Sequence, residues 1–155
     1  MIEIYNKNNN LIIQDSSKNE VVLDKNSLEV KLDWFEVSYP WEYEKSWILL
    51  EVKEFEEKLF YNFLVSGKHL VIITSDSFEL KEEILSFFWD VDVLVIIGSK
   101  ESAKIFENIE AKVVVPYWES KDIFLNTLGQ HSEEEEKYKL KWEFAIDATE
   151  FVNLK

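Results

Sequence analysis

Polar residues suited to ligand binding follow three apolar runs in the middle of the chain. The runs at residues 70–73, 91–97 and 112–115 are each followed by a loop with hydroxyl, carboxylate, glycine or aromatic residues. In an open α/β sheet, ligands bind beyond the carboxyl ends of parallel strands, so these loops are expected to line a pocket. The candidate pocket residues are Asp76, Ser77, Gly98, Ser99, Tyr117 and Glu119. Because Asp and Ser also favour helix N-caps, capping is the alternative role of the aspartate and the two serines.

Two histidines and no cysteine limit the metal chemistry of this chain. His69 and His131 have no histidine three or four residues away, so a zinc site would require distant carboxylates. We therefore expect two surface histidines and no cofactor. The alternative is a weak Mg²⁺ or Mn²⁺ site on Asp76, Glu119 and Asp122, since these ions prefer oxygen ligands. The sequence contains no glycine-rich phosphate loop and no Gly-x-Ser-x-Gly nucleophile elbow.

Hydrophobic periodicity divides the chain into three parts that must position these residues. Residues 1–66 contain short alternating or β-branched runs between polar clusters, which predicts a mostly antiparallel β-rich half. Residues 67–130 alternate continuous apolar runs with helical spacing, which predicts a βαβαβα half with parallel strands. Residues 131–155 form an acidic tail with a candidate strand at 138–144 and a candidate docking segment at 151–152. The predicted fold class is α/β.

Three helices are expected in the second part, where apolar residues recur at helical spacing. They span residues 79–88, 100–109 and 121–128. Asp76 or Ser77 is expected to cap the first helix, and Ser99 the second. Gly129 follows the third helix, at the position where a left-handed C-cap favours glycine.

The charge balance excludes several classes of function. The formal net charge is −14 and all 17 cations are lysines, so the chain has neither a basic stripe for nucleic acid nor a guanidinium for bidentate clamps. Apolar residues make up 46% of the chain, yet no run reaches the length of a membrane span. The first residues lack the basic and apolar regions of a signal peptide. We therefore predict one cytoplasmic domain, residues 1–155, whose partner is a small molecule, a protein or a second copy.

Several ordered motifs resemble those of one group of hydrolases. Residues 40–48 read PWEYEKSWI and are similar to a Pro-Gly-Glu-Tyr-Glu-x-x-Gly segment. That segment is typical of the metallo-β-lactamase-fold hydrolases related to L-ascorbate-6-phosphate lactonase. Further segments are similar to the family's hairpin with its metal-bridging Asp, a strand entry, the last helix and strand, and the closing helix: residues 67–76, 89–96, 103–116 and 124–129. The resemblance covers about residues 35–130 and implies a metallo-β-lactamase-like fold.

The catalytic signature of that family is missing from this sequence. The family carries a His-x-His-x-Asp-His cluster before the segment at 40–48, whereas residues 1–39 contain no histidine. Tyr117-Trp118 stands where the family has a histidine after its last strand. Asp76 matches the one metal-ligand position that is retained, and one carboxylate cannot hold the zinc that the family would use. The resemblance thus implies the fold and argues against the family's reaction.

Tryptophan is unusually frequent in this chain, and glycine is scarce. The chain has three glycines, whereas typical usage of about 7% predicts roughly 11. Its six tryptophans are Trp34, Trp41, Trp47, Trp89, Trp118 and Trp142, and the second, third and fourth fall where the family has glycine. One hypothesis is an alternative genetic code in which some of these codons are UGA read as glycine. The alternative is a chain with tryptophan in its core or on an interaction surface.

Three functions remain open from the sequence. The first is a pseudoenzyme, a metallo-β-lactamase-fold homologue that lost its histidine ligands and acts by binding or assembly. The second is a metal-dependent hydrolase with a rebuilt carboxylate site. The third is an α/β interaction module with exposed aromatic anchors, which predicts a large apolar surface patch.

Overall fold

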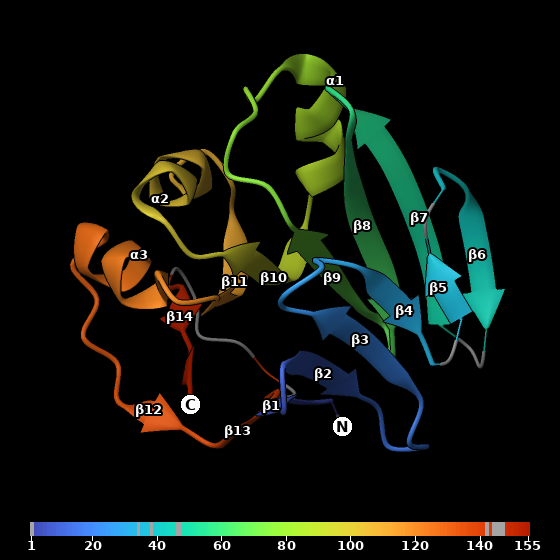
Figure 1. The fold of residues 1–155 in the computed structure, drawn as a ribbon, viewed down its shortest axis with the longest axis horizontal. Coiled ribbons are helices and arrows are strands. Elements are labelled where there is room, and N and C mark those ends of the chain that lie inside the picture. Colours follow the sequence, from blue (N-terminus) through green and yellow to red (C-terminus); the bar gives the residue numbers. More distant parts are fainter. Residues whose placement is uncertain (1, 34, 38, 46–47, 142, 144–147) are drawn as a thin grey trace.

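The computed structural model describes residues 2–33, 35–37, 39–45, 48–141, 143 and 148–155, and it contains two β-sheets that share a core (Figure 1). The strands of the first sheet are β1 (Glu3–Lys7), β2 (Asn10–Gln14), β3 (Glu20–Asp24), β4 (Val30–Leu32), β5 (Phe35–Val37) and β13 (Lys137–Lys139). Their order is β13-β1-β2-β3-β4-β5, and every pair is antiparallel. This sheet contains only residues 3–37 of the predicted β-rich half, with one strand added from the tail, and the later strands of that half belong to the second sheet.

The second sheet is mixed, because it joins the last antiparallel strands of the β-rich half to the predicted parallel strands. Its strands are β6 (Glu42–Lys45), β7 (Ile48–Phe55), β8 (Lys58–Val65), β9 (Lys68–Ile73), β10 (Val91–Ile97), β11 (Ala111–Tyr117) and β14 (Glu150–Phe151). Their order is β14-β11-β10-β9-β8-β7-β6. The pairs from β6 to β9 are antiparallel, and those joining β9, β10, β11 and β14 are parallel.

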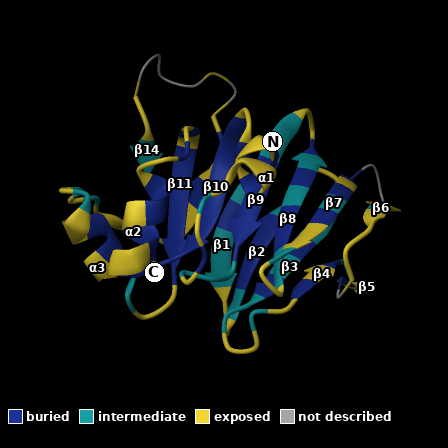
Figure 2. Ribbon diagram, turned by 90° about the horizontal axis from the view of Figure 1, so that it is seen from above, coloured by how far each residue is buried: buried dark blue, intermediate teal, exposed yellow. Residues whose placement is uncertain are grey.

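Strand β10 is buried along its whole length, which explains the predominantly apolar sequence of this segment. All seven of its residues are buried, because both faces of the sheet are covered (Figure 2). Val93 and Val95 face the core between the two sheets. Leu94 and Ile96 lie in the second core, beneath the helices. This alternation follows from the two-residue period of a strand.

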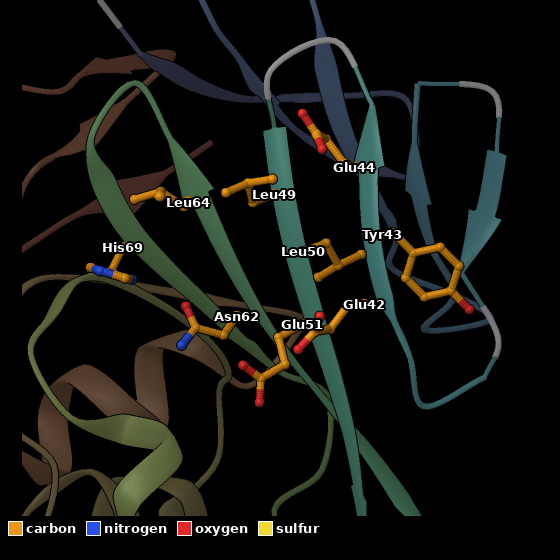
Figure 3. Close-up of a pocket in the computed structure, with 9 residues that line it drawn as sticks. All are labelled: Glu42, Tyr43, Glu44, Leu49, Leu50, Glu51, Asn62, Leu64 and His69. Carbon is orange, nitrogen blue, oxygen red and sulfur yellow. The ribbon is translucent and has the colours of Figure 1, made fainter.

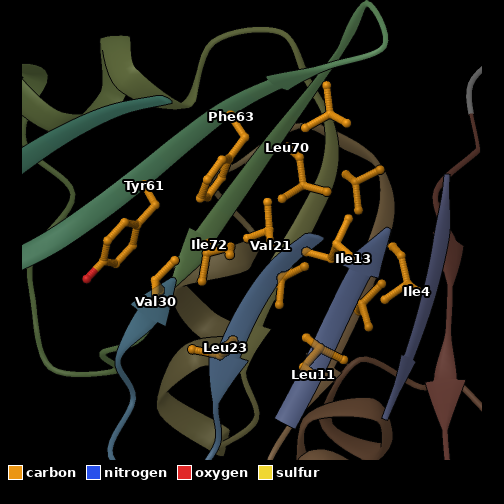
Figure 4. Close-up of a cluster of buried hydrophobic side chains, with 14 of the residues drawn as sticks. Ile4, Leu11, Ile13, Val21, Leu23, Val30, Tyr61, Phe63, Leu70 and Ile72 are labelled. Carbon is orange, nitrogen blue, oxygen red and sulfur yellow. The ribbon is translucent and has the colours of Figure 1, made fainter. Parts of the chain in front are cut away.

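The core between the sheets is almost entirely aliphatic on the side of the first sheet. Leu11, Ile13 and Leu23 lie opposite Phe63 and Ile72 of the second sheet (Figure 4). Each of these side chains is at most 1% exposed. No helix of the described residues contributes to this cluster, whereas helical residues supply much of the second one.

The first helix is shorter than the periodicity predicts. Instead of residues 79–88, the helical segments are α1 (Glu82–Leu85) and the 3₁₀ turn η1 (Ser86–Phe88). Lys81 occupies the N-cap position and no side chain caps the helix, so the prediction that Asp76 or Ser77 caps it was wrong. The physical reason is the late helix start: with Lys81 extended before Glu82, Asp76 and Ser77 no longer adjoin the first turn, whose free N–H groups a cap must reach.

The other two helices are α2 (Lys100–Phe106) and α3 (Lys121–Thr127). Ser99 caps α2 as predicted: its hydroxyl accepts from the Ser102 backbone N–H, and the Ser102 hydroxyl accepts from that of Ser99. Gly129 ends α3 at φ +69°, and Gln130 donates back to the Leu125 carbonyl, the pattern of a Schellman motif. Among the described residues, no helix is long and apolar enough to cross a membrane.

The tail pairs with both sheets. Strand β13 pairs with β1, and β14 pairs with β11 in parallel. A short parallel pair joins β12 (Glu134–Glu135) to β15 (Asn153–Leu154). Of the strand predicted at residues 138–144, the start lies in β13, and residues 142 and 144 lie outside the described residues.

Candidate functional site

The loops after β9, β10 and β11 begin at one edge of the second sheet. In the ladder, Ile96 is aligned with Ile73 on one side and with Pro116 on the other. The three strands are parallel, so the predicted pocket residues start from the same level of the sheet. The structure nevertheless places four of them in two separate cavities, and Gly98 and Ser99 in neither.

Asp76 and Ser77 line a cavity of about 570 Å³ near the start of α1. The other charged groups around this cavity are Glu56, Glu79, Lys81, Glu101 and Lys104. Lys81 lies 3.8 Å from Glu56 and 4.0 Å from Glu79. Lys81 thus lies near two of the acids, but carboxylates outnumber lysines around this cavity.

Tyr117 and Glu119 line a second cavity, of about 300 Å³, at the junction of the two sheets. The Tyr117 hydroxyl is buried and donates to the Ile73 carbonyl at 3.0 Å, which joins the ends of β11 and β9. Burial raises the pKa of Tyr117 well above its usual value. This phenol therefore stays protonated and fixes the strand ends.

Gly98 and Ser99 lie at the end of β10 and have structural roles. A Cβ on Gly98 would lie 2.6 Å from the Cα of Lys121, so only glycine lets the start of α3 approach this closely. The Gly98 N–H donates to the Tyr117 carbonyl at 2.7 Å. The Ser99 hydroxyl is occupied by its capping bond to α2.

The described residues do not supply the donors of a zinc centre. In the ranges that the structure describes, no three His, Asp or Glu side chains are grouped so that they could hold one ion. Asp76 and Glu119 line different cavities, and Asp122 lines neither. Zinc requires at least three protein ligands, so the zinc implied by the resemblance does not fit these residues.

The histidines lie away from the loops at the carboxyl ends of the strands. His69 is half-buried at the beginning of β9, and His131 is exposed after α3. His69 borders a cavity of about 480 Å³ on the face of β6 to β9, together with Glu42, Glu44 and Glu51 (Figure 3). No sequence pattern predicts this acidic face, because its residues come from separate strands.

Most residues of the Tyr117 cavity were not predicted, and three of them are polar residues from different elements. Asn6, Lys25 and Lys121 line it from β1, from the turn after β3 and from the start of α3. Burial lowers the pKa of Lys25, and the charge of Lys121 lowers it further. Residues so distant in sequence share no motif spacing, so the cavity could be found only in the folded chain.

Three of the six tryptophans lie in the described residues, and all three are exposed. Trp41 is 72% exposed, Trp89 80% and Trp118 46%. Trp118 has φ +87°, in the region that favours glycine, whereas Trp89 has φ −78°. Trp34, Trp47 and Trp142 lie outside the described residues. The recoding hypothesis stays a prediction, which six UGG codons in the gene would contradict.

The Trp118→Gly variant is expected to be more stable than the Trp118→Ala variant. Trp118→Gly and Trp118→Ala lose the same indole, but alanine keeps a Cβ that is strained at positive φ, which costs about 1 kcal/mol. At Trp89, with its ordinary φ, the order is expected to reverse by roughly 0.5–1 kcal/mol. Urea unfolding of the four variants measures both differences. Equal stability of the two variants at position 118 would contradict the strain at this residue.

Fold similarity links this chain to a known protein, although its sequence matches no family model and no curated protein. A solved structure from Thermotoga maritima, described as a "putative zn-dependent hydrolase of the metallo-beta-lactamase superfamily", aligns with 99% of this chain and 99% of its own. The TM-score is 0.73 and the sequence identity is 14%. At that identity the likeness concerns the fold alone. The chain therefore has the metallo-β-lactamase-like α/β fold that its motifs predicted.

Proposed function

We propose that this protein is a non-catalytic member of the metallo-β-lactamase fold, close to the lactonase-like branch, that acts in the cytoplasm by binding. The proposal rests on the side chains available to bind a metal ion. Residues 1–39 contain no histidine, and no three-donor group exists in the described ranges. A hydrolase of this fold needs a metal to generate hydroxide, and these side chains are not arranged to hold one.

The remaining polar residues at the strand ends do not supply a substitute nucleophile. The Ser99 hydroxyl is 8% exposed and caps α2, and the Tyr117 hydroxyl donates to a buried carbonyl. Neither makes a hydrogen bond to a histidine or carboxylate base in the described part of the chain. A binding role therefore accounts better for these loops than a rebuilt hydrolase on Asp76, Glu119 and Asp122.

Assembly with a protein partner or a second copy is the second candidate function. Tyr39, Trp41 and Trp89 are each more than 70% exposed. Large aromatic side chains are enriched among residues that dominate binding energy at protein interfaces. The net charge of −14 supports a partner other than nucleic acid.

Metal content and turnover test the proposal directly. We expect the purified full chain to contain far less than one zinc per molecule by elemental analysis. Hydrolysis of a phosphodiester and of a sugar lactone, with added Zn²⁺, Mn²⁺ or Mg²⁺, is expected to equal the rate without protein. Light scattering on the same sample reports whether the chain is a monomer or an oligomer.

Asp76→Asn is the control that separates true activity from contamination. This change removes the carboxylate at the retained metal-ligand position and keeps the side-chain volume. Stoichiometric zinc together with hydrolysis that Asp76→Asn abolishes would overturn the proposal. Hydrolysis with Mg²⁺ or Mn²⁺ that depends on both Asp76 and Glu119 would instead establish the rebuilt site.

A further inference from the structure

Strand β6 forms one edge of the second sheet and has an open side. It is the last strand in the order of that sheet, and in the part of the chain that the structure describes it pairs with β7 alone. The Trp41 carbonyl accepts from the Val52 N–H at 2.9 Å, so these two residues form a hydrogen-bonded pair at the start of the ladder. Hydrogen-bonded and non-hydrogen-bonded pairs alternate along an antiparallel ladder. The backbone N–H and C=O groups of Glu42 and Glu44 therefore point away from β7, toward the open side.

The side chains of the same two residues disfavour a second copy of this chain at the open edge. Two copies of β6 that form one continuous sheet are related by a two-fold axis perpendicular to that sheet, so side chains of the same face meet. Glu42 and Glu44 share a face because a strand has a two-residue period. A symmetric pair would place carboxylate opposite carboxylate, and like charges directly opposite each other are destabilising. The edge is therefore suited to a strand of different sequence.

The acidic face beside this edge consists of Glu42, Glu44 and Glu51. Glu51 of β7 lies directly opposite Glu42 (Figure 3), in a non-hydrogen-bonded pair, where side chains are closest. Glu51 has Lys53 as a partner, at 3.5 Å. Among the described residues, neither Glu42 nor Glu44 forms an ion pair. A cation supplied by a partner would therefore relieve the repulsion between these carboxylates.

Apolar side chains accompany the carboxylates on both faces of this edge. Leu49 of β7 is 45% exposed and lies between Glu44 on one side and Leu64 on the other (Figure 3). These residues border the cavity of about 480 Å³ described above. On the opposite face, Tyr43 contacts the exposed ring of Phe35, with ring centroids 5.8 Å apart. A strand added here would thus meet carboxylates on one face and apolar surface on both.

We propose that β6 accepts an extended segment of a partner protein as an added antiparallel strand, with lysine or arginine of that segment opposite Glu42 and Glu44. In this mode of recognition the main-chain hydrogen bonds supply affinity and the alternate side chains supply specificity. Antiparallel addition continues the pairing of β6 to β9. The residues between the cations are apolar, because they face Tyr43 and Phe35. The inference rests on the proposed binding function and names the chemistry of the partner.

Calorimetric titration of the full chain with short capped peptides tests the charge requirement. The probe is a peptide in which lysine alternates with valine, and we expect one peptide per chain with an affinity that falls as the salt concentration rises. The same peptide with glutamate in place of lysine is expected not to bind. Glu42→Gln and Glu44→Gln are each expected to weaken binding by about twofold to fivefold, since each removes one cross-strand charge pair. Glu110→Gln removes an exposed carboxylate just before β11, far from β6 in the sheet, and is the matched control.

Methylation of the peptide backbone distinguishes strand addition from simple attraction between charges. In an antiparallel pair, the lysines opposite Glu42 and Glu44 direct their N–H groups at β6, whereas the valine N–H groups point away. N-Methylation of the lysines is therefore expected to abolish binding, and N-methylation of the valines to preserve it. Hydrogen exchange supplies a second readout: the peptide is expected to protect the amides of Glu42 and Glu44 but not that of Tyr43, which already faces β7.

Binding that survives N-methylation of the lysines, or that is equal in the glutamine variants and the Glu110→Gln control, would overturn this inference. A chain that forms dimers without peptide, with the amides of Glu42 and Glu44 protected, would also overturn it, because a second copy would then occupy the edge. These outcomes leave the zinc and turnover measurements on the same protein unaffected. A failure of strand addition is therefore distinguishable from a failure of the proposed function.

Discussion

Phe60→Ala is expected to lower the free energy of unfolding by about 3–5 kcal/mol. Phe60 lies on β8, is fully buried, and contacts Phe78 and Phe88 edge-to-face with ring centroids 4.8 and 5.8 Å away. Truncation removes the ring that the loop before α1 and the turn η1 both pack against. The loss therefore combines transfer of a large side chain with a cavity that these short segments cannot refill.

Phe35→Ala is the matched control for this substitution. Phe35 lies on the edge strand β5 and is 42% exposed, so its truncation is expected to cost only about 1 kcal/mol. Urea unfolding monitored by circular dichroism measures both variants. A loss in Phe60→Ala no larger than that in Phe35→Ala would contradict the second core described above.

Gly98→Ala is expected to lower the free energy of unfolding by about 3 kcal/mol. The added methyl group would meet backbone atoms only: the Cα and N of Lys121 at 2.6 and 2.9 Å, and the carbonyl oxygen of Tyr117 at 3.0 Å. Backbone atoms cannot move aside as a flexible side chain does, so either α3 or the end of β10 must shift.

Gly129→Ala is the control that distinguishes the cost of a steric clash from the cost of a side chain at positive φ. Gly129 has φ +69°, but a Cβ there would meet nothing within 4 Å, so the substitution is expected to cost only about 1 kcal/mol. Equilibrium unfolding of the two variants by urea provides the comparison. If Gly98→Ala were no more costly than Gly129→Ala, the tight contact between β10 and α3 would be refuted.

Local patterns predicted most of the strands, although not β6, β12 or β15. The alternation in β3 and β4 places Val21, Leu23 and Val30 in the core, as a two-residue period requires. Continuous apolar runs became β9, β10 and β11, which are covered on both faces. These features depend on residues that are close together in the sequence, so local sequence patterns predict them.

The first helix shows where such local patterns fail. Leu80, Ile84 and Phe88 lie on one helical stripe, and that spacing predicted a helix from residue 79. Phe78 lies just before this stretch and packs against Phe60 in the same core as Ile84 and Phe88. The helix nevertheless begins only at Glu82, after Lys81 in an extended conformation. The periodicity therefore predicts the buried face correctly but not the residue at which the helix begins.

The sequence by itself determined the fold class, the parallel strands and the lack of a histidine cluster, because each is encoded in residue types at short spacing. Only the tertiary structure decided how the loop residues group. It separated Asp76 from Glu119 and brought Lys25 beside Lys121, which no local pattern records. Such groupings depend on how two sheets pack, and that packing is set by the sum of many apolar contacts rather than by the polar residues themselves.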